Sequence, residues 1–338
     1  MIRIILLVAC TLCIQAVNAQ TDTLNSEYIE RYPDKFFVWP VIKKKELSFG
    51  ISNRDDPDSK LNYKPNNAYS LGMGVYLFEV VLELSFAIPI GDRSTNTYGA
   101  SDVRDLQAAF LGNHWGADLF HQNYSGFYVA NPDATSSSPD PYIKRSDIKL
   151  INTGVTGIYA FSKNKFSLKS AYNYSERQLK SAGSFVVSGG VNTLRLQADS
   201  TVLTQVYSPI FYPTSSFKEF QYTGLSLAPG YTYTLVYKSF FLNGVFSYGP
   251  THYWISYTAK DQSTKYDISI NTFADIRFSL GYNSDRIFGG LSLRAQTREV
   301  RFEDIKFTNA SSTLRLLVGY RFREKGILKK RAKDIIPK

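Results

Sequence analysis

Histidine is scarce in this sequence, which limits the acid–base chemistry that the chain offers. The three histidines are His114, His121 and His252. A lipid hydrolase needs a histidine base beside a serine nucleophile and an orienting acid. Two groups supply these residue types, namely His121 with Ser125 and Asp118, and His252 with Ser256. Serine occurs throughout the chain, so the spacing is unspecific; we assign no catalytic residue and keep a hydrolase as an alternative hypothesis.

The sequence offers no metal or cofactor site. His114 falls in a predicted tight turn and His121 lies further along a strand, so the two are poorly placed to share a metal ion. Both cysteines, Cys10 and Cys13, lie in a predicted signal peptide, which leaves the mature chain without a thiol or a disulfide. We therefore predict no metal and no cofactor.

Arginine is the residue type whose pattern carries the most chemistry. Charged side chains recur on the polar face of the last strands, and with one earlier acid they are the predicted lumen-lining residues: Glu83, Asp275, Arg277, Arg294, Arg298 and Arg315, with Arg321 and Glu299 nearby. One interpretation is an electropositive pore or pocket for a small anionic solute or a lipid headgroup. The other is a network that pairs the arginines with Glu83, Asp105, Asp118 and Asp275 and closes a small barrel.

The elements that would position these residues are strands with a period of two. In the C-terminal third, apolar residues alternate with polar ones along 274–282, 291–296 and 313–322. Earlier runs with the same alternation cover 47–51, 69–77, 80–88, 103–111, 115–122, 148–161, 166–175, 225–235 and 240–248. About thirteen such runs give a prediction of about 12 to 14 antiparallel strands.

The connections between these runs alternate in length. Short turns are predicted at 78–79, 112–114, 162–165 and 237–239, and longer loops at 91–102, 125–147 and 260–265. The strand count is uncertain between Lys180 and Phe220. There Gly189-Gly190 could turn the run 184–196, and Val202–Tyr212 could hide another strand.

Alternation alone fits a soluble sandwich as well as a membrane barrel, in which the apolar face meets lipid and the polar face lines the lumen. Three features favour the barrel: a signal peptide over residues 1–19, runs of about ten residues, and the alternation of short turns and long loops. After the signal no stretch approaches the roughly 18 apolar residues of a membrane-spanning helix. The predicted fold is an all-β, transmembrane, antiparallel up-and-down β-barrel in a bacterial outer membrane.

The predicted organisation has four parts: a signal peptide at 1–19, a periplasmic lead-in at 20–44, the barrel at 45–323 and a basic tail at 324–338. The net charge is +10. Export makes nucleic acid an unsuitable partner, and anionic lipid or solute fits better. A further alternative is a structural or assembly protein that uses the tail and the segment Tyr28–Trp39 as contacts. Leu7-Val8-Ala9-Cys10 is similar to a lipidation box, but its apolar core is short.

Several stretches together resemble a known family. They are Tyr28-Ile29-Glu30-Arg31-Tyr32-Pro33-Asp34-Lys35-Phe36-Phe37, Lys64-Pro65-Asn66-Asn67, Gln122-Asn123-Tyr124-Ser125-Gly126-Phe127-Tyr128 and Glu176-Arg177-Gln178-Leu179-Lys180-Ser181-Ala182-Gly183-Ser184-Phe185. The family is a domain-of-unknown-function family of exported, predicted outer-membrane proteins from Bacteroidota. The resemblance runs from about Tyr28 to Phe322. It implies the barrel fold and the location, and it brings no catalytic residues.

Overall fold

A computed structural model describes residues 26–54, 60–77, 80–112, 114–130, 142–162, 164–203, 217–258 and 263–325. The predicted signal peptide, both cysteines and residues 326–338 of the basic tail lie outside the described residues, as do the predicted turn at 78–79 and most of the segment 202–212.

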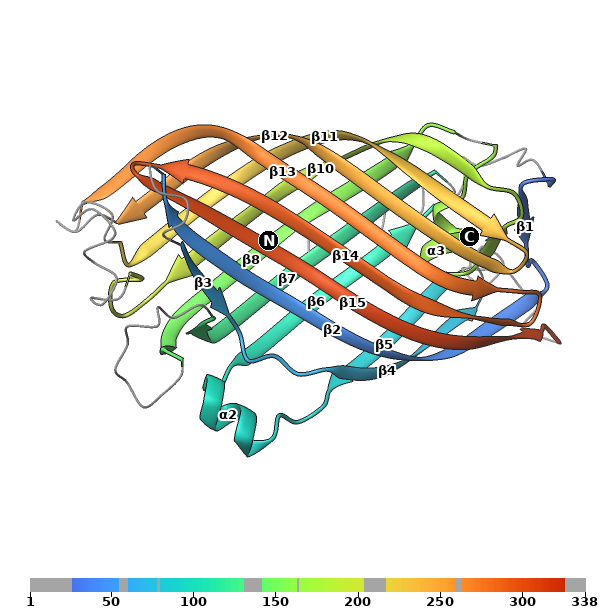
Figure 1. The fold of residues 1–338 in the computed structure, drawn as a ribbon, viewed down its shortest axis with the longest axis horizontal. Helices are drawn as coiled ribbons and strands as arrows, with labels where there is room; N and C mark the ends of the chain where they lie inside the picture. The colour runs from blue at the N-terminus through green and yellow to red at the C-terminus, as the bar shows by residue number, and fades with distance from the viewer. Residues whose placement is uncertain are drawn as a thin grey trace, which may run out of the picture.

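Long antiparallel strands form a closed barrel, which confirms the predicted fold class (Figure 1). Ten strands make the closed ring. They are β2 (Lys35–Asn53), β3 (Lys60–Lys64), β7 (Trp115–Val129), β8 (Lys144–Ala160), β10 (Ala182–Gln197), β11 (Glu219–Tyr237), β12 (Phe240–Thr258), β13 (Thr264–Asn283), β14 (Ile287–Phe302) and β15 (Ile305–Arg323). The ring closes where β15 pairs with β2, from Ile305 opposite Asn53 to Arg323 opposite Lys35.

Three shorter strands complete the 13-stranded sheet, which agrees with the predicted 12 to 14. They are β4 (Ser70–Leu77), β5 (Val80–Ala87) and β6 (Asp102–Leu111). At one end of the barrel β3 alone lies between β2 and β7, whereas at the other end β4 pairs with β2, β5 pairs with β4 and β6 pairs with β7. Among the described residues no ladder joins β5 to β6. We call the gap between the facing edges of β5 and β6 the seam.

The two ends of the barrel differ. Arg323 and Lys35 lie together at one end, here called the termini end, where β11 and β12 are joined by the short turn at 238–239. The opposite end, here called the loop end, carries the longer connections. The segment between β5 and β6 contains a short helix, α2 (Asp92–Tyr98), within the predicted loop at 91–102. Asn66 holds this segment beside the break between β3 and β4, because its amide donates to Gly99 O at 2.8 Å.

Two predicted boundaries are wrong. The barrel begins at Lys35 and not at residue 45, since β2 pairs with β15 and β4 along its first residues. The predicted strand at 166–175 is instead a short helix, α3 (Leu168–Tyr172), whose N-cap Ser167 accepts a hydrogen bond from the Ser170 amide. By contrast β10 runs without interruption through Gly189 and Gly190, which pair with strands on both sides.

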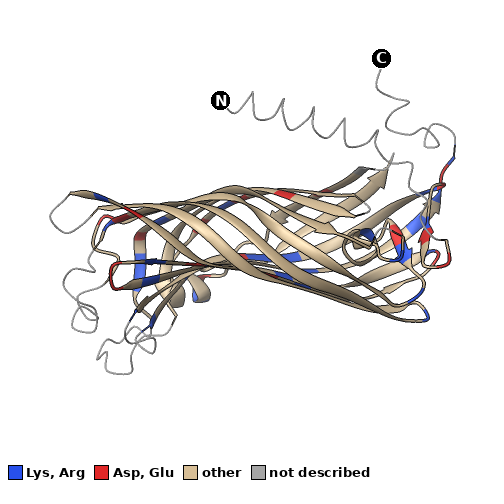
Figure 2. Ribbon diagram, turned by 90° about the horizontal axis from the view of Figure 1, so that it is seen from above, with Lys and Arg blue, Asp and Glu red and all other residues tan. Residues whose placement is uncertain are grey.

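The outer surface is apolar in the half of the barrel near the termini. Along β15 the outward side chains are Leu314, Leu316, Val318, Tyr320 and Phe322, all exposed. Toward the loop end the outward side chains become polar, as Thr297, Glu299 and Arg301 do on β14. Charged residues gather toward the two ends and at a few places along the strands, while long stretches of the wall carry none (Figure 2).

The interior has three layers. Near the loop end it is an apolar core, in which Leu47, Phe49 and Ile51 of β2 point inward and are buried. The expectation that the polar face lines the lumen is therefore wrong for this layer. The middle layer is polar and charged. At the termini end a plug fills the lumen, formed by α3 and by the two-stranded sheet of β1 (Ile29–Arg31) and β9 (Glu176–Gln178). No helix in the described part of the chain is long and apolar enough to cross a membrane.

Candidate binding chamber inside the barrel

Two carboxylates and two guanidinium groups meet in the middle layer of the lumen. Arg277 and Asp275, both on β13, are 2.9 Å apart at their closest oxygen and nitrogen atoms. Across the lumen, Asp118 of β7 lies 2.7 Å from Arg294 of β14 and 3.7 Å from Arg277. These ion pairs join strands on opposite sides of the barrel, because inward positions of distant strands face one another across a small lumen.

A small cavity adjoins these pairs. Its lining comes from Gln107, Asp118, Leu119, Phe120, Gln122, Asn152, Arg294, Gln296, Ser311 and Thr313. The amide of Asn152 donates to Gln122 Oε1 at 2.9 Å, and Gln122 Nε2 donates to Asp105 Oδ2 at 2.9 Å. We call this cavity the chamber. Its walls present carboxamides, hydroxyls and charges to whatever occupies it.

Arg298 is a buried cation without a counter-ion. It is the next inward position after Gln296 on β14, and only 1% of its surface is exposed. Its Nε and Nη1 atoms have no hydrogen-bond partner in the described protein, and no ion pair is formed there. The guanidinium lies 4.6 Å from the Phe273 ring centroid, and its cross-strand neighbour Asn309 is also buried with its amide unpaired among the described residues. Such a charge is costly unless a ligand pairs with it.

Aromatic packing closes the lumen on the loop side of the chamber. Phe49 stacks on Tyr63 at a centroid distance of 4.5 Å, and Phe220 stacks on Phe302 at 4.6 Å. Phe307 contacts both stacks, with centroids 5.6 Å from Phe49 and 4.8 Å from Phe220. The resulting core spans the lumen, so polar solutes have no continuous polar path through this layer.

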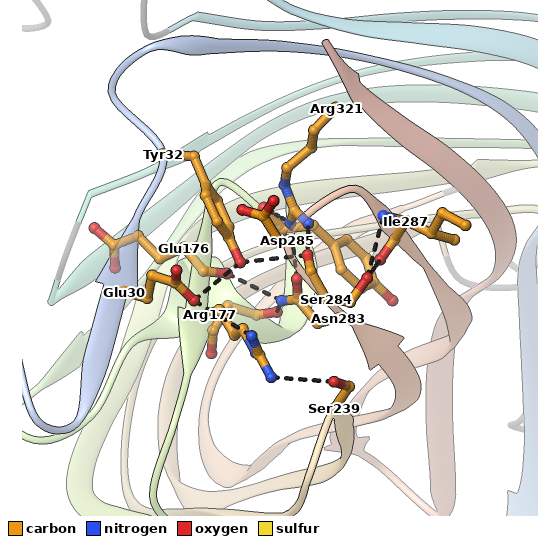
Figure 3. A network of polar contacts seen from close by, with 12 residues as sticks. Glu30, Tyr32, Glu176, Arg177, Ser239, Asn283, Ser284, Asp285, Ile287 and Arg321 are labelled. Atoms are coloured by element: carbon orange, nitrogen blue, oxygen red, sulfur yellow. Dashed lines mark hydrogen bonds and ion pairs between the residues drawn. The ribbon is translucent and has the colours of Figure 1, made fainter. Parts of the chain in front are cut away.

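The plug closes the termini side. Arg315 Nη1 donates to Tyr172 O at 2.9 Å, Asn283 Nδ2 to Glu176 O at 3.0 Å, and Arg321 Nη2 to Tyr174 O at 2.6 Å. Figure 3 places Arg321 and Asn283 of the wall beside Glu30, Tyr32 and Arg177 of the plug. Burial raises the pKa of Tyr32 to about 12 and that of Tyr174 to about 12.

Glu83 of β5, beside the seam, holds several donors. It accepts from Arg315 Nη2 at 2.5 Å and from Trp39 Nε1 at 2.6 Å, and it forms an ion pair with Lys43. Arg315 therefore connects β15 to the plug and to β5. Trp39 and Lys43 were outside the predicted lumen set, because the predicted lead-in at 20–44 placed them outside the barrel wall.

Among the described residues, neither hydrolase candidate has a hydrogen bond between its histidine and its serine. Asp118 points into the lumen, whereas His121 Nδ1 lies 2.7 Å from Thr153 Oγ1 and His121 is exposed on the outer face of β7. His252 packs against Trp254, another outward residue, with ring centroids 4.5 Å apart. Among the described residues no group of three potential metal ligands occurs.

The lead-in residues form part of this chain's own plug. The β1 residue Ile29 pairs with Gln178. The Nζ atoms of Lys165 and Lys180 lie 5.5 and 5.3 Å from the centroid of the Tyr28 ring, in cation–π contacts. Of the acids predicted to pair with arginine, Asp105 instead lies 3.3 Å from Lys45. Spacing alone gave no signal for these contacts, because the partners are far apart in the sequence.

Comparison with solved structures finds barrels of bacterial outer membranes. The outer membrane protease OmpT from Escherichia coli is 8% identical, with 86% of this chain and 97% of that chain covered and a TM-score of 0.37. The translocator domain of the autotransporter NalP from Neisseria meningitidis is 12% identical, with 93% and 97% covered and a TM-score of 0.32. The toluene transporter TodX of P. putida is 10% identical, with 87% and 91% covered and a TM-score of 0.23.

The sequence comparisons are more specific. No curated protein matches the chain. One family model matches residues 20–322, which include the plug and all of the barrel wall except Arg323. The chain belongs to the family described as Domain of unknown function (DUF4421).

Proposed function

We propose that this protein is an outer-membrane β-barrel that binds a small anionic group inside a closed lumen and does not conduct. The observation that carries the proposal is Arg298, a buried guanidinium without a counter-ion, two positions along β14 from the chamber residue Gln296. Two carboxylates, Asp118 and Asp275, stand against three guanidinium groups, those of Arg277, Arg294 and Arg298, so the site carries one excess positive charge. A single anionic group would neutralise it.

The apolar outer band supports a membrane location. On β15 it runs from Leu314 to Phe322, a length suited to a tilted strand that crosses the hydrocarbon. Aromatic side chains such as Tyr237, Phe240 and Tyr282 lie where the band ends at the termini. Polar outward residues cover the rest of each strand, which would project beyond the membrane at the loop end.

Two layers of the interior argue against a continuous pore. The aromatic core around Phe49 and Phe220 fills the lumen on one side of the chamber, and the plug fills it on the other. We expect purified protein in planar bilayers to give no steady conductance, and Arg294→Ala to leave it silent. Stable anion-selective conductance would contradict the proposal, since ions would need a continuous water-filled path.

Ligand binding is tested with glycerol 3-phosphate as the probe. A bound anion stabilises the folded state in proportion to the logarithm of its concentration, by about 2.7 kcal/mol at a hundred times Kd. We expect the thermal midpoint of the detergent-solubilised protein to rise with probe concentration, and Arg298→Gln to abolish the rise. The matched control is Arg195→Gln, whose guanidinium lies on the outer surface 3.8 Å from Glu219. Equal responses of both variants would refute the role of Arg298.

A further inference from the structure

We propose that the seam between β5 and β6 admits a phosphate-bearing membrane lipid sideways, so that its headgroup enters the chamber while its acyl chains stay in the bilayer. This inference rests on the proposed function and names the ligand class and its route. The first support is the strand pairing. β5 pairs only with β4 and β6 only with β7 in the described ladders, so two backbone edges face each other without hydrogen bonds between them.

The second support is the exposure of inward side chains beside the seam. Inward positions around the chamber on continuous strands are buried or half-buried, as Asn152 of β8 and Ser311 of β15 are. Gln107 and Ala109 share the inward face of β6 with Asp105, yet both are exposed. The inside of the barrel is therefore open to the outside at this position of the wall.

The third support is the level of the seam within the wall. β4 pairs with β2 from Phe37 to Lys43, which is the part of β2 that faces the apolar band, and β5 continues that row. Outward side chains beside the seam are among the most exposed apolar residues of the protein: Leu82 at 62%, Leu84 at 73%, Phe86 at 76% and Leu106 at 70%. These side chains would meet hydrocarbon, so in a bilayer a membrane lipid has direct access to the seam.

The chamber lies directly behind the seam. Gln107 of β6 and Phe120, its cross-strand neighbour on β7, both line it, together with Arg294 on the far wall. A lipid lying in the seam would place its polar group among Gln107, Gln122 and Arg294 and its first methylenes against Phe120. The excess positive charge at Arg298 selects an anionic headgroup, and the carboxamides donate to phosphate oxygens.

The route is tested by cross-linking the seam. Leu84→Cys with Leu106→Cys, joined by a bismaleimide, bridges β5 to β6. Met73→Cys with Leu84→Cys is the matched control, because Met73 and Leu84 already face each other across the β4–β5 ladder. The only native cysteines are Cys10 and Cys13 in the predicted signal peptide. The proteins are equilibrated with vesicles of phosphatidylglycerol and phosphatidylcholine and then extracted. Native mass spectrometry measures which lipid remains bound to each protein, and how much.

We expect the control to retain phosphatidylglycerol in preference to phosphatidylcholine, and the seam cross-link to lower that retention at least tenfold. Equal retention in both cross-linked proteins would overturn the lateral route. If glycerol 3-phosphate stabilises both cross-linked proteins equally, the chamber is filled from water and the route is likewise refuted, while the proposed function stands. Loss of any dependence on Arg298 in uncross-linked protein would instead refute the proposed function.

A second variant guards against a cross-link that distorts the wall. Ala109→Trp places a large side chain at an exposed inward position of β6 and leaves every ladder intact. Folding is checked by the shift between heated and unheated samples in electrophoresis. We expect folded Ala109→Trp to lose phosphatidylglycerol retention as the seam cross-link does, and a folded variant with full retention would count against the route.

Discussion

Replacing Arg298 by methionine should stabilise the ligand-free protein, although most substitutions of buried residues destabilise. A buried charge left without a partner costs about 3 to 5 kcal/mol. The contact of the guanidinium with the Phe273 ring, at 4.6 Å, returns about 2 kcal/mol of that cost. Methionine keeps most of the chain length and fills the space, so the free energy of unfolding should rise by about 1 to 3 kcal/mol.

The same substitution at Arg277 should have the opposite sign. Arg277 is equally buried, but it is paired with Asp275 at 2.9 Å, so its removal leaves a carboxylate with weaker compensation. We expect Arg277→Met to lower the free energy of unfolding by about 3 to 5 kcal/mol. Urea unfolding in detergent micelles, followed by tryptophan fluorescence, measures both. If Arg298→Met destabilises as Arg277→Met does, Arg298 is a structural residue and the reasoning that makes it a ligand site is wrong.

Three further predictions concern the seam, the plug and the loop end. Glu83→Gln should lower the free energy of unfolding by about 3 kcal/mol, because Arg315 and Lys43 lose the carboxylate that they share. In the same urea titration the control Glu219→Gln, which removes an exposed ion pair, should lower it by less than about 1 kcal/mol. The raised pKa of Tyr32, about 12 against 10 when unfolded, means that its stabilising effect is complete below pH 10 and is lost between pH 10 and 12. Tyr32→Phe should make the stability profile less steep there, leaving the contribution of Tyr174, and an unchanged slope would exclude Tyr32 as one of its sources. Gly126→Ala should destabilise the protein by about 2 kcal/mol or more, since φ is +79° and the new Cβ would meet Ala100 O at 2.3 Å. The control Gly244→Ala has open space around its Cβ and should change the melting temperature little. Equal effects of the two variants would rule out backbone strain at Gly126 as the cause.

The strands near the C-terminus could be predicted from the sequence because each alternates over its whole length. In β13 to β15 the apolar residues that face outward, such as Phe278 and Leu316, repeat every second position. Arg277 and Arg294 lie on the inward face, opposite these apolar residues. Their partner Asp118 comes from a strand more than a hundred residues earlier, so periodicity could name it as a candidate and could not assign the pair.

Other features escape a period of two. Near the start of β2 both faces are apolar, with Val38 outward and Trp39 inward. Further along the strand only the inward residues, such as Phe49 and Ile51, are apolar, so the pattern changes within one strand. The helix α3 is only five residues long, and its one sequence signal is Ser167 as the N-cap. The seam exists because β5 and β6 do not pair with each other in the described ladders. The sequence of a single strand does not indicate which other strands it will pair with.

The junction above the seam has a mechanical consequence. β3 and β7 are joined by two residue pairs, Tyr63 with Val129 and Lys64 with Tyr128, whereas β2 and β15 are joined along their whole length. The wall between β2 and β7 is therefore fastened at the loop end and divided at the membrane level. A small rotation about that short junction would separate the edges of β5 and β6 by a larger distance, because they lie further from the pivot. Side chains that pack at the junction, such as Tyr63 and Phe127 around Phe49, would then set the width of an opening that none of them lines.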